Sequence, residues 1–246
     1  MKELEDYTWF PNILRRFQME FIGWVVYHFH IYKGLVPHLD GLFKASKQHS
    51  IFDLCSGTGD PVRYLLKHTS CKAAVLTDKF PQEHENHDSM VYKRESVDAL
   101  QLDLPQQGLV TMFNAFHHFD ETQQFKLLQR LATHHQGFCI VEILQPHLLD
   151  VLKIAFTTTI GQVLVTPFIR PFSWKRLLFT YLFPINLITI TYDGVVSVLK
   201  SGSLKYYEAM TKNLLLDQYK LNVKMLPSSW GSRLLVISGY SNKEDD

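Results

Sequence analysis

Two glycines follow a short apolar run near position 55, where a strand would have to turn sharply into a helix. Residues 53–60 read Asp-Leu-Cys-Ser-Gly-Thr-Gly-Asp. Because Gly57 and Gly59 lack a Cβ, the backbone can approach a ligand closely, and the N–H groups that begin the next helix can hold a carboxylate or phosphate. Taken alone, this loop is equally consistent with a tight turn and with a nucleotide site.

Three acidic residues stand where three successive strands of a parallel sheet would end. Asp53 ends the first apolar run, Asp78 follows the second and Asp98 follows the third. The carboxylate of Asp78 is placed to accept two hydrogen bonds from a ribose diol, and that of Asp98 to accept one from an exocyclic adenine amine. Together the three acids predict a site shaped for a nucleoside.

Two other phosphate-binding patterns compete for this loop. A dinucleotide fingerprint requires a third glycine or alanine where this chain has Val62, and an acid such as Asp53 is not part of it. A P-loop requires Gly-Lys-Ser or Gly-Lys-Thr, which does not follow the loop. The sequence excludes the P-loop and leaves dinucleotide binding as the nearest alternative.

Short apolar runs alternate with helical segments through the middle of the chain. Asp60-Pro61 suits a helix N-cap followed by proline at the first helical position, and Asp120 with Gln123 suits a capping box. This alternation is typical of an α/β fold, a Rossmann-like doubly wound sheet with its ligand at the carboxyl ends of the strands. The runs expected as strands are 50–54, 73–77, 90–93, 109–113 and 138–141, followed by a strand pair at 219–226 and 233–239.

Helical segments are expected on either side of this core. Residues 12–32 carry apolar side chains at the spacing of a helix face and need a cover. A long apolar stretch follows the fifth strand, and within it Tyr192-Asp193-Gly194 is predicted as a turn that could face a substrate. We expect one domain, 1–246, with an N-terminal helical lid (1–47), a core (48–145), a helical insertion or cap (146–217) and a terminal strand pair (218–241).

Four stretches of the core resemble the successive motifs of class I S-adenosylmethionine-dependent methyltransferases, and the glycine loop is most similar to the ubiquinone- and menaquinone-biosynthesis type. The resemblance covers about residues 48–145. It implies a seven-stranded sheet with an antiparallel last strand and S-adenosylmethionine across the carboxyl ends of the first strands. The stretches are Ile-Phe-Asp53-Leu-Cys-Ser-Gly57-Thr-Gly59, Leu-Thr-Asp78, Val-Asp98-Ala-Leu and Phe-Asn114-Ala-Phe-His117-His118.

The resemblance also implies which residues contact each part of the cofactor. The sequence departs from the family at Cys55, where a glycine is common, and at Gln107-Gly108, where an aspartate usually precedes the fourth strand. Cys55 narrows the loop, but neither departure removes a cofactor contact. The expected contacts are Asp53, Cys55, Gly57 and Gly59 around the methionine part, Asp78 and Lys79 at the ribose, Asp98 and Ala99 at the adenine, and Asn114 near the methyl group.

His117 and His118, just past the fourth strand, are the candidate catalytic residues. A sulfonium methyl is already a strong electrophile, so the protein must chiefly align the acceptor and exclude water. If the acceptor is a hydroxyl, an imidazole is the best-placed base because it titrates near neutral pH. The two histidines could instead cap the next helix or line the pocket. Glu142, at the end of the fifth strand, could reach substrate or be held in a salt bridge.

No metal site is expected from the histidine pattern. The chain has 12 histidines, but His28 and His30 would lie on different faces of a helix. The other candidates lack a tetrahedral Cys/His spacing; they are His84, His87, His134 and His135.

Charge and cysteine content exclude several classes of protein. With 25 Lys and Arg against 24 Asp and Glu, the chain lacks the basic footprint of a nucleic-acid-binding protein. Its 3 cysteines, none in a CxxC pair, favour a reducing cytoplasm. The first residues do not resemble a secretory signal. The longest uncharged runs, 154–169 and 177–192, are interrupted by Pro167 and Pro184, which disfavours a membrane-spanning helix.

Aromatic residues make up 13% of the chain and concentrate in the N-terminal helix and in the insertion. Between 154 and 192 the only charges are Arg170, Lys175 and Arg176. Cations set among aromatic residues suit a lipophilic acceptor or a membrane interface. Packing on the core or on the N-terminal helix, and a homodimer interface, are the alternatives.

The sequence therefore predicts a cytoplasmic methyltransferase that uses S-adenosylmethionine and a small apolar, aromatic or lipid-like acceptor, with no nucleic acid as partner. Peripheral contact with the inner face of a membrane is one open role of the insertion. Two alternatives remain, namely a catalytically silent homologue that binds the cofactor as a scaffold, and a nicotinamide-dependent reductase on the same sheet.

Overall fold

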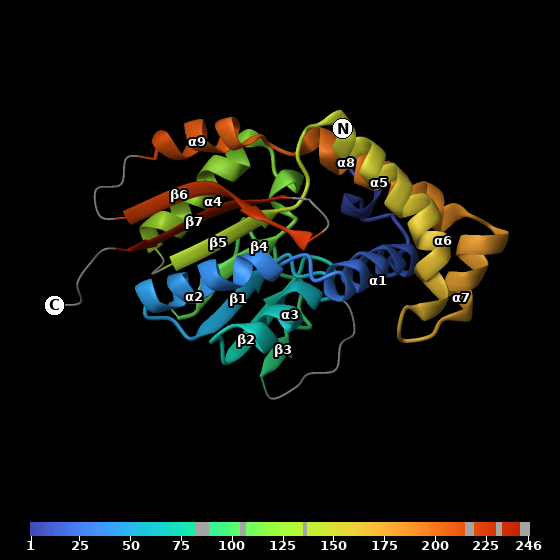
Figure 1. Ribbon diagram of the computed structural model, residues 1–246, viewed down its shortest axis with the longest axis horizontal. Coiled ribbons are helices and arrows are strands. Elements are labelled where there is room, and N and C mark those ends of the chain that lie inside the picture. Colours follow the sequence, from blue (N-terminus) through green and yellow to red (C-terminus); the bar gives the residue numbers. More distant parts are fainter. Residues whose placement is uncertain (82–88, 104–106, 135–136, 215–218, 230–232, 242–246) are drawn as a thin grey trace.

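A seven-stranded sheet forms the centre of the computed structural model, which describes residues 1–81, 89–103, 107–134, 137–214, 219–229 and 233–241 (Figure 1). The strand order is β3-β2-β1-β4-β5-β7-β6. Of these strands β7 alone runs in the opposite direction, antiparallel to β5 and β6 on its two sides. This confirms the expected α/β sheet with a reversed last strand. The strands are β1 Ser50–Leu54, β2 Ala73–Thr77, β3 Met90–Tyr92, β4 Leu109–Phe113, β5 Gly137–Glu142, β6 Tyr219–Pro227 and β7 Arg233–Ser241.

Helices cover both faces of the sheet because its central strands are apolar on both sides. Along β5, Cys139 and Val141 belong to the cluster under α2 and α3, whereas Phe138 and Ile140 belong to the cluster under α4 and α9. Successive side chains of a strand point to opposite faces of the sheet, so a strand buried on both faces contributes alternate residues to the two clusters. The covering helices are α2 Val36–Ala45, α3 Asp60–His68, α4 Glu121–His134 and α9 Leu204–Lys212.

Local capping signals place these helices close to their expected starts. Asp120 and Gln123 form the predicted capping box, since the backbone N–H of each donates to the other's side chain at 3.0 Å and 2.9 Å. The helix expected after Asp60 as N-cap instead begins at Asp60, and Gly59 is its N-cap. Pro61 lies in the first turn, where its missing N–H leaves no hydrogen bond unmade.

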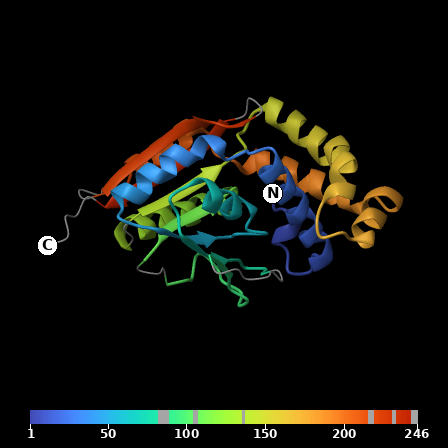
Figure 2. The ribbon, with the colours of Figure 1, turned by 60° about the horizontal axis from the view of Figure 1, so that its bottom comes forward.

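A second group of helices stands at one end of the sheet (Figures 1 and 2). The N-terminal helix α1 (Asn12–His28) ends before the expected position 32. Residues 148–168 form one continuous helix of 21 residues. We call the segments between 148 and 200 the helical cap. They are α5 Leu148–Phe156, a π turn Thr157–Gly161, α6 Gln162–Val165, a 3-10 turn Thr166–Phe168, α7 Trp174–Leu177, a π turn Leu178–Leu182 and α8 Ile185–Lys200.

The expected turn at Asp193-Gly194 is wrong, because both residues lie in the middle of α8. Gly194 is instead the point where α5 lies closest to α8. A Cβ added there would lie 2.6 Å from Cγ2 of Ile154. The glycine therefore permits a close helix crossing rather than a change of chain direction.

Counting uncharged runs disfavoured a membrane-spanning helix in the sequence, but it missed one long apolar helix. By length and composition, the helix Leu148–Phe168 is long and apolar enough to cross a membrane, a test that a core helix of a soluble protein also passes. Counting uncharged runs missed it because Asp150 and Lys153 lie in its first turns, and because Pro167 falls in its last turn. Pro184 does break the second run, since Trp174–Leu182 and Ile185–Lys200 meet at an angle of 80°.

Two glycines in helix interiors allow a matched test of the α5–α8 crossing. Gly41 in α2 has no atom within 4 Å of an added Cβ, so Gly41→Ala should raise the free energy of unfolding by about 0.5–1 kcal/mol. Gly194→Ala should lower it by about 1–3 kcal/mol, because the new methyl group meets Ile154. Urea unfolding of both variants measures the difference. Equal stabilisation by both substitutions would contradict the close crossing.

Candidate functional site

The glycine loop between β1 and α3 takes a left-handed backbone conformation at three positions. The φ angles are +55° at Cys55, +54° at Gly57 and +73° at Gly59. Glycine adopts such angles without strain, whereas a residue with a Cβ does so at an energetic cost. Cys55, noted in the sequence as an unusual residue at its position, therefore occupies a place where the backbone itself favours glycine.

Asp78, expected at the ribose, holds this loop against the end of β2. Its buried carboxylate accepts the backbone N–H of Gly57 and that of Phe80, both at 2.8 Å. On the other side of the loop, the hydroxyl of Tyr92 donates to the carbonyl of Gly57 at 2.6 Å. The loop is thus fixed by side chains from β3 and from the end of β2, and the ribose contact of Asp78 stays a prediction.

The two other acids differ sharply in environment. Asp53 is buried, and its carboxylate accepts the hydroxyl of Thr111 at 2.5 Å; burial raises its pKa to about 7. Asp98 is partly exposed and accepts from Lys79 at 3.0 Å and from the backbone N–H of Leu100 at 3.0 Å. Partial burial acts to raise the pKa of Asp98, but these hydrogen bonds and the Lys79 charge hold it below its ordinary value.

The remaining predicted cofactor residues lie at the same edge of the sheet. Burial, and next the carboxylates of Asp78, Asp53 and Asp98, raise the pKa of the Cys55 thiol well above its ordinary value. Ala99 is buried. Asn114, at φ +50°, bridges β4 and β5 because its N–H donates to Val141 and its Oδ1 accepts from Ile143. The cofactor roles of all these residues stay predictions.

Helix α1 packs directly on the glycine loop. A Cβ added at Gly23 would lie 2.0 Å from Oδ2 of Asp60 and 2.6 Å from Oγ1 of Thr58. The side chain of Met19 lies 3.9 Å from the corresponding position on Gly57. Helix α1 therefore covers the loop, as a lid over the site would.

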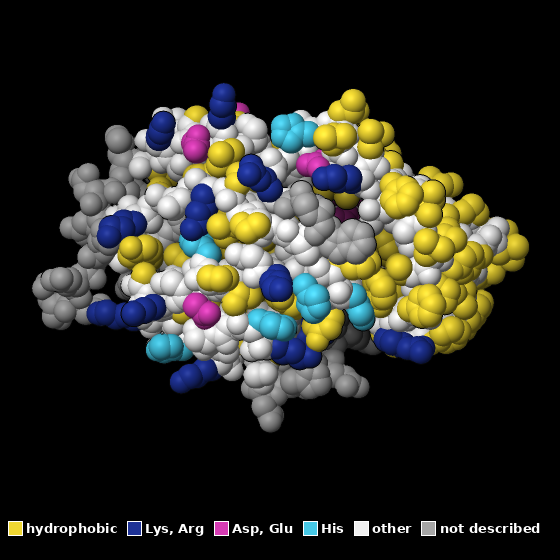
Figure 3. All heavy atoms as spheres, viewed as in Figure 1, with side chains coloured by type: hydrophobic (Ala, Val, Ile, Leu, Met, Phe, Trp, Pro, Cys, Tyr) yellow, Lys and Arg dark blue, Asp and Glu magenta, His cyan; other side chains and the backbone are white. Residues whose placement is uncertain are grey.

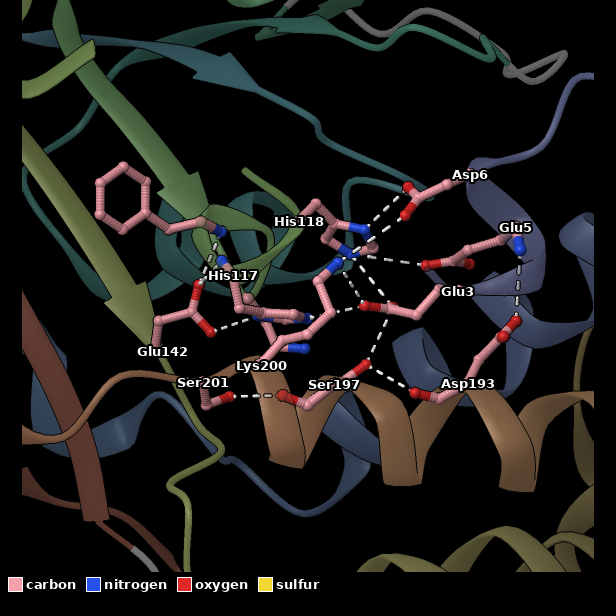
Figure 4. A network of polar contacts seen from close by, with 12 residues as sticks. Glu3, Glu5, Asp6, His117, His118, Glu142, Asp193, Ser197, Lys200 and Ser201 are labelled. Carbon is pink, nitrogen blue, oxygen red and sulfur yellow. Dashed lines mark hydrogen bonds and ion pairs between the residues drawn. The ribbon is translucent and has the colours of Figure 1, made fainter. Parts of the chain in front are cut away.

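The side chain of His117 is oriented by a buried carboxylate (Figure 4). Oε2 of Glu142 lies 2.7 Å from Nδ1 of His117, and Oε1 accepts the backbone N–H of Phe116 at 2.6 Å. Since an ionised carboxylate only accepts, the neutral form of this ring has its proton on Nδ1 and its lone pair on Nε2. Nε2 is buried and has no hydrogen-bond partner among the described residues, and Oε1 of Glu3 lies 3.9 Å from it.

His118 faces acids from the first six residues of the chain. Its Nδ1 lies 2.9 Å from Asp6, and its Nε2 lies 3.5 Å from Glu3 and 3.6 Å from Glu5. Burial acts to lower the pKa of His118, but the hydrogen bond with Asp6 and the three acidic charges raise it to about 9. His118 is therefore protonated at neutral pH, and the catalytic roles of His117 and His118 stay predictions.

Helix α8 holds the first six residues of the chain in place, which we call the N-terminal segment. Asp193 accepts the backbone N–H groups of Leu4 and Glu5 at 2.5 and 3.3 Å. Ser197 donates to Oε2 of Glu3 at 2.9 Å, and Lys200 lies 3.1 Å from Oε1 of the same residue. The sequence offered no signal for these contacts, because its acidic start has no spacing relation to His118 or to α8.

Three of these side chains also have the ligand atoms of a metal site. The atoms of Glu3, His117 and His118 lie within 4.8 Å of one another. Lys200 and protonated His118 already neutralise Glu3 there, so the geometry does not call for a cation. Four other histidines were considered from the sequence as metal ligands. His84, His87 and His135, and the side chain of His134, lie outside the described residues.

The comparisons with known proteins bear on the fold only. No protein-family model matches the sequence, and no curated protein matches it. Among solved structures, human N-acetylserotonin methyltransferase in complex with SAM has a TM-score of 0.49 at 13% identity, over 84% of this chain and 51% of the other. Mitomycin 7-O-methyltransferase has 0.46 at 12% identity, over 80% and 50%.

A plantazolicin methyltransferase, solved with SAH, has a TM-score of 0.48 at 11% identity, over 94% of this chain and 98% of the other. This chain spans about half the length of the first two structures. At these identities and scores the likeness assigns no activity to this chain.

The charged cluster at His118 predicts a pH dependence of stability. His118 has a folded pKa of about 9 against an ordinary value of 6.5, so its contribution is complete below pH 6.5 and is lost as the pH rises through 9. Burial raises the pKa of Glu5 to about 8 from 4.5, which acts in the same direction over pH 4.5–8. The melting temperature should therefore fall between pH 6.5 and 9.

His118→Gln should make this dependence shallower, because it removes one of the two groups that titrate. His147→Gln, which changes an exposed histidine, should leave it as in the wild type. Thermal unfolding of the three proteins at several pH values provides the measurement. The same slope in His118→Gln as in the wild type would show that His118 is not protonated in the folded protein.

Proposed function

We propose that this protein is an S-adenosylmethionine-dependent methyltransferase that acts on a hydroxyl group of a small apolar molecule. The observation that carries the proposal is the position of the His117–Glu142 pair. The pair stands at the ends of β4 and β5, next in the sheet to the glycine loop of β1 and to Asp78 after β2. A nucleoside-shaped site and a base therefore lie at one edge of the sheet.

The chemistry of the loop fits this cofactor better than a dinucleotide. Asp53, Asp78 and Asp98 follow three neighbouring strands near Cys55, and in the described part of the chain Asp98 alone among them pairs directly with a lysine. A carboxylate-rich site favours the sulfonium and ammonium charges of S-adenosylmethionine and repels a pyrophosphate. The left-handed angles at Gly57 and Gly59 let the backbone turn beneath the ligand. When bound, the cofactor supplies an electrophilic methyl group.

His117 would act as the general base. Its Nε2 lone pair can take the proton of an acceptor hydroxyl, and the carboxylate of Glu142 then stabilises the imidazolium that forms. A hydroxyl placed against Nε2 has to displace Glu3, whose Oε1 lies 3.9 Å away. Access to the base therefore runs through the N-terminal segment, which also keeps water from the methyl group.

We extend the proposal to a lipid-like acceptor and a cytoplasmic location. The likeness of the loop to the ubiquinone- and menaquinone-biosynthesis type supports a lipid-like acceptor, as do the exposed apolar residues of the helical cap. Three free thiols support a reducing, cytoplasmic location. A cofactor-binding scaffold without activity is the second candidate, favoured by the burial of Nε2 of His117 behind Glu3.

Cofactor binding is the first test of the proposal. S-Adenosylhomocysteine at about 100 times its dissociation constant should stabilise the protein by roughly 2.7 kcal/mol, which raises the melting temperature by about 5–10 °C. Asp78→Asn should weaken this effect, because it removes the charge that orders the loop and accepts from the ribose. A shift with NAD or NADP and none with S-adenosylhomocysteine would identify a reductase instead.

The role of His117 is tested by turnover, measured as transfer of labelled methyl from S-adenosylmethionine into a lipid extract. His117→Gln and Glu142→Gln should lower the rate by about 10²–10⁴-fold and leave the affinity for S-adenosylhomocysteine unchanged. His68→Gln, whose ring is bonded to its own helix at the carbonyl of Tyr64, is the matched control and should keep full activity. Cofactor binding without transfer in the wild type would favour the scaffold.

A further inference from the structure

The helical cap exposes an unusual amount of apolar surface (Figure 3). Sixteen of the twenty large hydrophobic residues that are exposed in the described part of the chain lie between 148 and 199. Six of them form a stripe along the helix 148–168, and each is 53–69% exposed. Monomeric soluble proteins rarely expose a continuous apolar patch of this kind. The stripe consists of Leu149, Leu152, Phe156, Ile160, Leu164 and Phe168.

Polar side chains occupy the inner side of the same helices. In the helix 148–168, Thr158, Gln162 and Thr166 are buried, at helical spacing opposite the stripe. The other buried polar residues of the helical cap are Arg176, Thr180, Asn186, Thr189, Asp193 and Ser197. A helix that packs its polar side inward and presents its apolar side outward has the reverse of the pattern that water selects.

The buried charge in this interior is neutralised within the protein. The guanidinium of Arg176 pairs with Glu20 of α1 and donates to the carbonyl of Ile169 at 2.7 Å. Arg176 is therefore not one of the surface cations that the sequence suggested. The buried guanidinium thus ties the helical cap to α1.

We propose that the outer surface of the helical cap docks on a lipid bilayer, where it lies in one leaflet. Its exposed residues provide the apolar face of an interfacial helix, and Trp174 beside Lys175 provides the aromatic and basic edge that such helices carry. The inner side of α8 holds the N-terminal segment through Asp193 and Ser197, so only the outer side is free to enter lipid. The helical cap therefore lies on the membrane and does not cross it.

Charge favours a bilayer over a second copy of the chain. From 154 to 192 the sequence has no Asp or Glu, and Arg170 and Lys175 are its exposed charges. In a two-fold symmetric dimer this face would meet itself, and these cations would find no acid on that stretch of the partner. Anionic headgroups complement both the cations and the apolar stripe.

The test is flotation of the full-length protein with vesicles of phosphatidylcholine, with or without phosphatidylglycerol. The wild type should float with both and more completely with phosphatidylglycerol. The triple variant Leu152→Gln, Phe156→Gln, Leu164→Gln should bind at least about tenfold more weakly, because it removes exposed apolar area while glutamine keeps the helix. Its circular dichroism and melting temperature should match the wild type, since the three side chains are exposed.

Controls separate lipid docking from adsorption. Val91→Gln, which alters an exposed residue on β3 away from the helical cap, should float like the wild type. Arg170→Gln and Lys175→Gln should each reduce binding to phosphatidylglycerol vesicles about fivefold, the factor for about 1 kcal/mol per cation, and leave phosphatidylcholine binding unchanged.

Three results would overturn the proposal. They are failure of the wild type to float, flotation of the triple variant equal to the wild type, and a lipid-free dimer that the triple variant abolishes while neither protein floats. Light scattering after size-exclusion chromatography detects that dimer. Flotation requires no cofactor and no turnover, so its outcome is independent of the proposed methyl transfer.

Discussion

The carboxylate of Glu142 connects the sheet to the rest of the candidate site. It is fully buried at the end of β5, so it requires hydrogen-bond donors, and the turn after β4 supplies the N–H groups of Phe116 and His117 together with the His117 imidazole. These bonds fix the direction of His117 and of the next residue, His118. His118 then meets the acids of the N-terminal segment, and α8 binds the same segment from the other side.

Helix α8 has two different environments along its length. Toward the site it presents Asp193, Ser197 and Lys200, which hold the first residues of the chain. Away from the site it exposes Ile188 and Leu199. The proposed membrane face and the base therefore lie on opposite sides of one helix.

The strands, their order in the chain and the capping box of α4 could be predicted because each depends on neighbouring residues. The capping box at Asp120 and the parallel strands followed from local pattern. The turn expected at Asp193-Gly194 did not form, since packing against Ile154 rewards a glycine inside a helix as well as at a turn. The helix 148–168 was missed because charged residues in its first turns interrupt an uncharged run without interrupting a helix.

The sequence by itself determined the sheet, the glycine loop and the acids at its rim, because strand periodicity and turn chemistry are local properties. Only the tertiary structure decided which acidic partner each of the two histidines meets. His118 pairs with Asp6 across 112 positions, and Leu4 donates to Asp193 across 189, distances at which no spacing rule applies. The tertiary structure also decided the outward direction of the apolar stripe. Composition reveals that a helix has an apolar side, but what lies against its polar side determines which side remains exposed.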